Sequence, residues 1–398
     1  MRQVGEQANR PNPWPLYARL RQDRVVRLDE GSYATGRYDD VLALLHDPRL
    51  SSDPHTLTDP GDRIIMDIMP FIDRDPPAHD RLRRVATRFF GPPDSPGLVT
   101  SQEPEIRRQI DTLIGAFPES GEVDVVDGFA YPLPVAVISR LLGVPAADEP
   151  QFRGWATQAV GGLDAANLED SEAAVKRRDE GLLALFSYLG ELVKKHRGSP
   201  DGSMLSGLAN DDSADAMTDM DLQVTGVMLL IAGHETTVNL ITNGTLTLLR
   251  NPDALARLRR EPGWVVPVTE ELLRFEPPLQ YLPNRAALAD IIIDGTTIAK
   301  GSKLTLLIAA ANRDPGRFAD PDRFDPDRPD NQHLGFGSGL HYCFGAPLAR
   351  VEVQLALTAL ASRLDNPRLT DDPPPYRPSP VLRGPLHLPV AYDARRTR

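Results

Sequence analysis

Cysteine is nearly absent from this chain, which contains one cysteine in 398 residues. A single thiol excludes an intrachain disulfide and a structural zinc site built on several thiolates. Long apolar runs are missing as well: no stretch of about 18 uncharged apolar residues occurs, so we expect no transmembrane helix. The first 30 residues contain no apolar segment that resembles a signal peptide. Together these absences favour a cytoplasmic protein.

Positively charged residues are fewer than negatively charged ones. Lys and Arg total 44 against 56 Asp and Glu, and the formal net charge of −12 argues against general nucleic-acid binding. Aromatic residues are few at 6%, but 41% hydrophobic and 25% charged residues are ordinary for a globular protein with a large core. At about 150 residues per domain, the length alone allows two or three domains.

Amphipathic helical patterns dominate what is present, and proline-rich loops separate them. The periodicity predicts helices over 78–90, 102–116, 173–196, 220–249, 252–260, 264–275 and 346–363. Short β patterns predict small peripheral sheets with strands at Val25–Leu28, Ser32–Thr35, Ile291–Ile293 and Leu304–Ile308. The acidic segment 210–221 indicates a surface loop before the long helix.

The lone cysteine, Cys343, lies in a glycine-rich segment, HLGFGSGLHYCFGAPLARVE, at 333–352. The glycines are Gly335, Gly337, Gly339 and Gly345. Because glycine permits positive φ and close backbone approach, this loop can fold tightly beneath a flat partner. Pro347 suits the first turn of a helix, so the sulfur is expected near a helix N-terminus, where a thiolate is stabilised. A single buried cysteine is usually an inert small hydrophobe, but four nearby glycines argue against that interpretation.

Two other motifs, for dinucleotide binding and for zinc binding, are incomplete. The run GFGSGL lacks the third glycine of a dinucleotide-binding loop, since Leu340 stands in its place and no strand is predicted before it. His234-Glu235 begins like a zinc-protease motif, but Val238 occupies the position of the second histidine.

The run from Phe336 to Gly345, FGSGLHYCFG, closely resembles the haem-binding loop of the cytochrome P450 family. The resemblance implies haem b as cofactor and the Cys343 thiolate as the ligand of its iron. It also places Phe336 and Gly345 against the cofactor and assigns His341 to a haem propionate. The implied fold is mainly α, with a large helical part and small peripheral sheets, as a single haem-thiolate monooxygenase domain over 1–398.

The segment AGHET at 232–236 resembles the oxygen-binding helix of the same family. By resemblance, Gly233 leaves room above the iron, the Thr236 hydroxyl bonds the bound oxygen, and Glu235 serves the proton relay. An acid beside an alcohol suits this role, because the chemistry needs a donor at the oxygen and a titratable group connected to solvent. His234 is interpreted as a structural polar residue.

His79 and Arg83 stand four residues apart, on one helix face. The resemblance assigns both, together with Arg285, to the haem propionates, which guanidinium groups bind well. Further arginines on the opposite face, Arg81, Arg84 and Arg88, form a candidate docking patch for an acidic electron-transfer protein.

A further element of the family is a buried Glu-x-x-Arg pair with a third arginine. Glu271 and Arg274 match the pair, and Arg323 is expected as its third member, in a structural role.

The reaction implied by the resemblance is insertion of one oxygen atom from dioxygen into a small lipophilic or aromatic substrate. Electrons are expected from NAD(P)H through a ferredoxin reductase and a ferredoxin. The expected substrate contacts are apolar or aromatic: Met228, Ile231, Ala232, Tyr281, Leu282 and Val381. A plain core role fits each of these residues about equally well.

Other functions stay open. Phenol coupling and desaturation share every motif. Direct use of peroxide is disfavoured, because Glu235 and Thr236 are both present and a peroxide-driven reaction needs no proton relay. A non-catalytic haem sensor or carrier is a further alternative.

Overall fold

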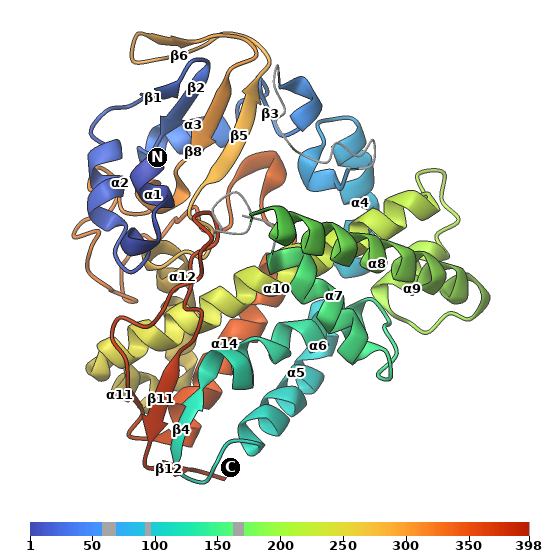
Figure 1. Ribbon diagram of the computed structural model, residues 1–398, viewed down its shortest axis with the longest axis vertical. Coiled ribbons are helices and arrows are strands. Elements are labelled where there is room, and N and C mark those ends of the chain that lie inside the picture. Colours follow the sequence, from blue (N-terminus) through green and yellow to red (C-terminus); the bar gives the residue numbers. More distant parts are fainter. Residues whose placement is uncertain (58–68, 92–96, 162–170, 398) are drawn as a thin grey trace.

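A computed structural model describes residues 1–57, 69–91, 97–161 and 171–397. Its α-helices are α1 Arg2–Gly5, α2 Trp14–Leu20, α3 Tyr38–Leu45, α4 Ala78–Phe90, α5 Gly97–Gly115, α6 Pro132–Leu141, α7 Glu149–Gly161, α8 Ser171–Gly198, α9 Met204–Ala209, α10 Asp219–Arg250, α11 Pro252–Arg260, α12 Val265–Phe275, α13 Ile308–Ala311 and α14 Ala346–Arg363. Figure 1 shows these helices forming most of the molecule, with the strands gathered toward two ends.

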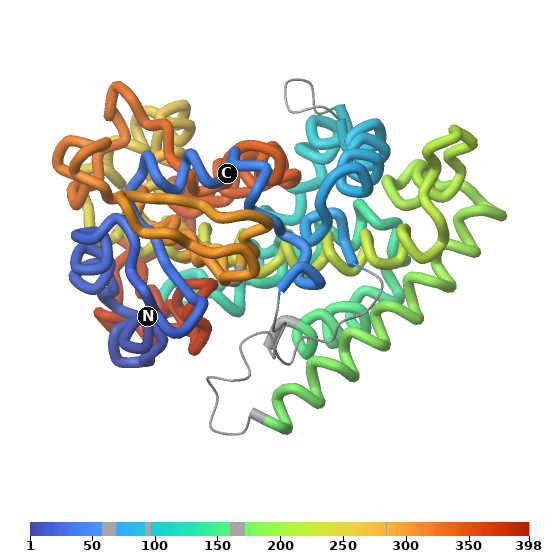
Figure 2. Tube along the Cα trace, turned by 90° about the horizontal axis from the view of Figure 1, so that it is seen from above, coloured from blue at the N-terminus to red at the C-terminus, as the bar shows by residue number. Residues whose placement is uncertain are grey.

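The strands form small separate sheets. They are β1 Val26–Asp29, β2 Ser32–Thr35, β3 Leu50–Ser51, β4 Gly121–Asp124, β5 Leu282–Ala287, β6 Ile291–Ile293, β7 Thr296–Ile298, β8 Lys303–Leu306, β9 Leu364–Asp365, β10 Arg368–Leu369, β11 Pro389–Tyr392 and β12 Ala394–Arg395. The largest sheet has the order β1-β2-β8-β5-β3, and only its β2–β8 pair is parallel. Seen from above, this N-terminal and orange part lies on the opposite side of the molecule from the green helix α8 (Figure 2).

Helix α10 is the central element of the core. It starts with a capping box, in which the Thr218 side chain and the Asp221 carboxylate each accept a backbone N–H of the first turn. By length and composition the helix could cross a membrane, but 72% of its most apolar window is buried inside the protein, as in a core helix. It packs against α6, α8 and α14. At Gly244 a Cβ would lie 2.9 Å from Leu272 on α12 and 3.1 Å from Leu357 on α14. The absence of a side chain therefore lets both helices pack close to α10.

The predicted fold class, mainly α with small peripheral sheets, is confirmed. Three predicted helices match α4, α11 and α14 residue for residue, and strand β2 is equally well predicted. The predicted helix at 102–116 begins earlier, at Gly97. The sequence analysis missed α3, α6 and α7. It also missed the sheet that joins β4 to β11, because that pairing links segments more than 260 residues apart.

Candidate functional site

The loop that contains Cys343 is wedged between α12 and α3 through two glycines. A Cβ at Gly335 would lie 2.5 Å from the Leu273 carbonyl oxygen, and one at Gly339 would lie 2.5 Å from the Leu45 carbonyl oxygen. Gly339 also has a φ of +66°, a left-handed conformation that glycine adopts without strain. The loop can therefore pack directly against the backbone of both helices.

Cys343 lies at the end of this loop, just before α14. Its backbone N–H donates to the Phe336 carbonyl at 2.9 Å, which closes the loop. The Phe344 ring packs 5.6 Å from Phe71 and 4.6 Å from Phe90. Burial raises the pKa of the Cys343 thiol, while backbone N–H groups of the first turn of α14 and nearby arginines act in the opposite direction.

Two histidines, one in the loop and one on the neighbouring helix α4, each have a buried nitrogen that lacks a hydrogen-bond partner within the described chain. These atoms are His79 Nε2 on α4 and His341 Nδ1. The two rings lie 4.6 Å apart, and His79 uses its other nitrogen for Asp80, at 2.9 Å. Because buried polar atoms normally have partners, both nitrogens point to a ligand with acceptor oxygens.

The electrostatic field at His341 supports the same conclusion. Burial, followed by His79, Arg285 and Arg83, lowers the pKa of His341 to about 3. Arg83 is half-buried and donates to the Tyr342 carbonyl at 2.6 Å, and Arg285 lies on β5. Four nitrogen-bearing side chains therefore converge on one place, which suits an acidic group. The residues present fit the two propionates of haem.

On α10, the stretch expected to bind oxygen is more exposed than the parts of the helix directly before and after it. Ala232 is exposed, and Ile231, Gly233 and Thr236 are only partly buried. The Thr236 hydroxyl donates to the Ala232 carbonyl at 2.6 Å, a contact that tends to bend a helix. The expected roles of Gly233, Glu235 and Thr236 at the bound oxygen stay predictions.

The structure gives Gly233 a packing role that the sequence reasoning did not foresee. A Cβ here would lie 3.0 Å from Cδ1 of Ile138 on α6. A side chain at this position would therefore press on α6, and the expected role of Gly233 above the iron stays a prediction.

Glu235 is buried and directed toward the C-terminal part of the chain. Its Oε1 lies 3.0 Å from Nε of Arg377 and 3.4 Å from Nδ2 of Asn239. Arg377 belongs to a segment folded back on itself, since its N–H donates to the Gly384 carbonyl at 3.1 Å. The sequence reasoning missed Arg377 because nothing local marks an arginine whose partner lies 142 residues away.

His234 is fully buried beneath the Tyr131 ring, with the two ring centroids 4.4 Å apart. Burial, assisted by Arg377 and Arg153, lowers the pKa of His234 to about 3. The ring is therefore neutral at physiological pH.

The residues predicted to contact substrate fall into two groups. Ile231, Leu282 and Val381 are partly buried and Ala232 is exposed, so these side chains are accessible. Met228 and Tyr281 are buried in core clusters, at 6% and 9% exposure.

The arginines of the candidate docking patch on α4 have counter-ions within the chain, and docking of a redox partner at this patch stays a prediction. Each arginine pairs with an aspartate of the segment that leads into α10 or of the first turn of that helix: Arg81–Asp221 at 3.1 Å, Arg84–Asp215 at 2.8 Å and Arg88–Asp211 at 2.7 Å. The sequence analysis treated the arginines and the acidic segment separately, although the fold brings them together.

The Glu271–Arg274 pair is confirmed as a fully buried ion pair at 2.7 Å. The expectation that Arg323 is the third member of this element is wrong. The Arg323 side chain is 69% exposed, and only its carbonyl accepts from Arg274, at 3.1 Å. The guanidinium that approaches Glu271 belongs to Arg328, at 3.7 Å.

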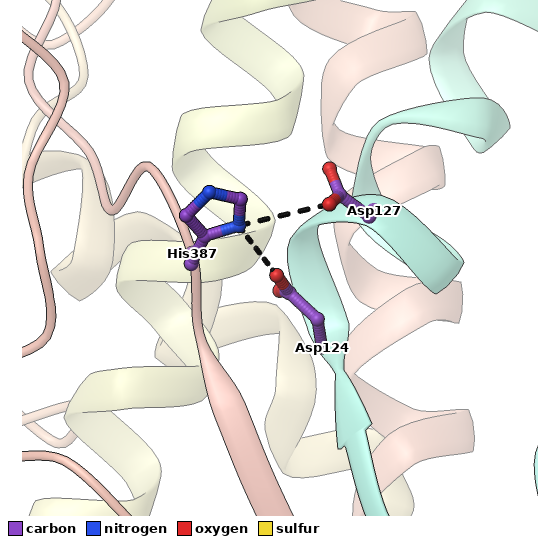
Figure 3. Close-up of side chains that lie close together, drawn as sticks. All are labelled: Asp124, Asp127 and His387. Carbon is purple, nitrogen blue, oxygen red and sulfur yellow. Dashed lines mark hydrogen bonds and ion pairs between the residues drawn. The ribbon is translucent and has the colours of Figure 1, made fainter.

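A separate cluster of two carboxylates and one imidazole joins β4 and the following turn to the segment before β11 (Figure 3). His387 Nδ1 lies 2.7 Å from Asp124 and 3.6 Å from Asp127. The other oxygen of Asp124 accepts the backbone N–H groups of Val126 and Leu388. These bonds identify the cluster as a tie between chain segments.

Comparison with known proteins agrees with this geometry. A family model described as Cytochrome P450 matches residues 184–388. The chain is 38% identical to the vitamin D(3) 25-hydroxylase of Pseudonocardia autotrophica, with 96% of this chain and 94% of that protein covered. It is 36% identical to the cytochrome P450 monooxygenase PikC of Streptomyces venezuelae, covering 96% and 91%. The ligand-free structure of CYP164A2 from Mycobacterium smegmatis is similar with a TM-score of 0.88 and 38% identity, covering 98% of each chain.

Proposed function

Because this chain belongs to the cytochrome P450 family, we propose that it hydroxylates or epoxidises a small lipophilic or aromatic organic substrate. The protein is a monooxygenase with haem b as its cofactor and dioxygen as its co-substrate.

The observation that carries the residue assignments is the pair of buried, unpartnered imidazole nitrogens at the Cys343 loop. We assign His79 Nε2 and His341 Nδ1, with Arg83 and Arg285, to the two haem propionates. The Cys343 sulfur would then hold the iron, with Phe336 and Gly345 beside it. When bound, the haem supplies the activation of dioxygen and the transfer of one oxygen atom to the substrate.

Thr236 and Glu235 would deliver protons to the reacting oxygen. The Thr236 hydroxyl faces the open part of α10, so it can turn from the Ala232 carbonyl to donate into the site. Glu235 would resupply that proton from solvent. Since its carboxylate is paired with Arg377, proton uptake at Oε1 requires this ion pair to loosen.

The substrate would lie against the accessible apolar side chains of Ile231, Ala232, Leu282 and Val381, with Met228 and Tyr281 packed behind them. Apolar contacts of this kind favour a lipophilic or aromatic molecule. The name of one relative, vitamin D(3) 25-hydroxylase, supports hydroxylation as the reaction.

We propose that the electrons come from NAD(P)H through a ferredoxin reductase and a ferredoxin, in the cytoplasm. The docking face would be the surface hollow of about 560 Å³ that α4 forms with Leu340. The Arg84–Asp215 pair at this face is exposed, and exposed pairs contribute little stability. An acidic partner can therefore replace Asp215 as the counter-ion of Arg84.

Turnover with a ferredoxin and its reductase tests the function. Substrate-dependent NAD(P)H consumption that yields oxygenated product is expected. Turnover with peroxide alone would instead indicate a peroxygenase, and binding without turnover would indicate a sensor or carrier.

A pair of variants tests the proton delivery. Thr236→Ala should keep the haem but divert most reducing equivalents to peroxide, whereas Thr236→Ser keeps the hydroxyl and should stay coupled. Equal coupling in the two variants would contradict the role of the hydroxyl.

A further inference from the structure

Two consecutive glutamates of α12 have entirely different partners. Glu271 is buried with Arg274, in the pair described above, and its Oε1 also accepts the Asp325 N–H at 2.8 Å. Glu270 points elsewhere, toward Arg350 on α14 and His333 at the start of the loop. Its contacts play no part in the function proposed above.

Arg350 binds Glu270 through both arms of its guanidinium. Nε donates to Oε1 at 2.7 Å and Nη2 donates to Oε2 at 2.8 Å, which is the bidentate geometry of a strong pair. Burial raises the pKa of Glu270, but the hydrogen bonds from Arg350 and His333 outweigh it and lower the pKa to about 2. The pair is therefore charged across the physiological range.

His333 is fixed in one neutral tautomer by its two partners. Its Nδ1 accepts the Gly335 N–H at 3.0 Å, so the ring proton must sit on Nε2. That nitrogen lies 3.0 Å from Oε2 of Glu270 and donates to it. The side chain is 3% exposed, so it is a buried link between α12 and the loop.

The same arginine reaches the immediate surroundings of Cys343. Nη1 of Arg350 donates to the Tyr342 hydroxyl at 3.2 Å, and Tyr342 directly precedes Cys343. The guanidinium also lies over the Phe336 ring, 4.6 Å from its centroid. Phe336 in turn accepts the Cys343 N–H through its carbonyl, at 2.9 Å. Arg350 thus contacts two of the residues that set the position of the sulfur.

We propose that Glu270, Arg350 and His333 form a charged brace that fixes the cysteine loop and sets the charge environment of the sulfur. All three are positioning residues, since none of them touches the reacting atoms. The brace joins α12, α14 and the loop, and it places the cation of Arg350 in contact with Tyr342 and Phe336 and the anion of Glu270 on the far side of that cation's bidentate pair. This inference rests on the proposed ligation of the haem iron by Cys343.

The two charges of the brace should shift the midpoint potential of the haem in opposite directions. A nearby cation stabilises the reduced, more negative state of the iron site, and a nearby anion destabilises it. In the holoenzyme, Arg350→Gln should therefore lower the midpoint potential of the haem and Glu270→Gln should raise it. A role in stability alone would not produce shifts of opposite sign.

A variant that keeps the charge of Arg350 tests separately whether this residue positions the cysteine loop. Arg350→Lys keeps the cation but loses the bidentate contact, because an ammonium is not a planar fork. Its midpoint potential should stay near that of the wild type. A larger fraction of its reduced carbon monoxide complex should lack the thiolate-type Soret band, which reports a loosened loop.

The matched control is Glu103→Gln, which neutralises an exposed glutamate paired with Arg107 on α5. It should change neither the potential nor the carbon monoxide spectrum. If a single brace variant fails to retain haem, the double variant Glu270→Gln, Arg350→Gln leaves no uncompensated charge. The midpoint potential of the double variant should lie between the potentials expected for the two single variants.

The outcomes separate this inference from the proposed function. Unchanged potentials, or shifts of the same sign in Arg350→Gln and Glu270→Gln, would overturn the brace. So would an Arg350→Lys spectrum identical to that of the wild type. A wild-type protein without the thiolate-type band would instead contradict ligation by Cys343 itself.

Discussion

At the scale of single residues, the buried ring nitrogens of His79 and His341 are the most direct indication of a bound ligand. Each histidine is buried or half-buried in or next to the cysteine loop, and each has one ring nitrogen without a hydrogen-bond partner within the described chain. Leaving such a group unsatisfied costs about 1–3 kcal/mol, so a partner bearing oxygen atoms stabilises the site.

Replacing His79 by Phe tests this at one nitrogen. The His79 ring already lies among aromatic neighbours, 6.3 Å from Phe71, so the substitution preserves the packing. A hydrogen bond to a charged group contributes about 1.5–3 kcal/mol, and its loss should weaken haem binding about 10- to 100-fold. Transfer of haem to an acceptor apoprotein measures the affinity. An unchanged transfer rate would mean that His79 does not contact the cofactor.

Glu352 on α14 is a buried acid with no charged partner among the described residues, and burial raises its pKa to about 8. Since the folded-state pKa lies above the ordinary value of 4.5, the folded protein binds the extra proton between these two pH values. The stability of the wild type should therefore fall as the pH rises through this window.

The variant Glu352→Gln keeps the shape but cannot ionise. Its stability relative to the wild type should rise by about 3 kcal/mol between pH 5 and pH 7.5. Denaturant unfolding at the two pH values measures the difference. A difference that does not change with pH would show that Glu352 is ionised in the folded protein.

At the scale of single elements, the cysteine loop depends on direct backbone contact with α12. A side chain at Gly335 cannot fit, since its Cβ would lie 2.5 Å from a carbonyl oxygen that has no freedom to move away. Gly335→Ala should cost about 1–3 kcal/mol through overpacking and should reduce the fraction of thiolate-ligated haem.

Gly263 supplies the matched control for this substitution. A Cβ at this position meets nothing within 4 Å, so Gly263→Ala should leave both stability and the spectrum unchanged. Equal behaviour of the two variants would contradict the importance of the close approach.

Elements governed by local pattern were predictable from the sequence. Helix α4 has apolar residues on one face and arginines on the other, and its bounds were predicted residue for residue. Cys343 and the acid–alcohol pair of α10 were found because their motifs are contiguous. The family resemblance, and not periodicity, supplied their expected roles.

Features that depend on tertiary contact were not predictable in this way. Arg377 reaches Glu235, and Arg350 reaches Glu270, across long stretches of chain, so no local pattern marks either pair. The arginines of α4 looked like a free basic face, because only the fold reveals that Asp211, Asp215 and Asp221 lie opposite them. Net charge along a sequence therefore says little about the charge of one surface.

At the scale of the whole molecule, a segment near the N-terminus is hydrogen-bonded to the segment 378–383. The Arg383 side chain donates to the Arg10 carbonyl at 2.7 Å, and Arg10 donates to the Pro378 carbonyl at 3.0 Å. Helix α10 packs with helices from both halves of the sequence. We propose on these grounds that residues 1–398 form a single domain.

If the chain is a single domain, no part of it should fold alone. Limited proteolysis of the holoenzyme should therefore release no fragment that remains folded by circular dichroism after separation. A released fragment with its own cooperative unfolding transition would contradict the proposal.

The central claim is that Cys343 ligates haem iron within this fold, and the carbon monoxide difference spectrum of the reduced protein tests it most directly. The wild type should show the Soret band typical of thiolate-ligated haem, and Cys343→Ala should lose it. A band typical of histidine-ligated haem in the wild type, or no bound haem at all, would contradict the account.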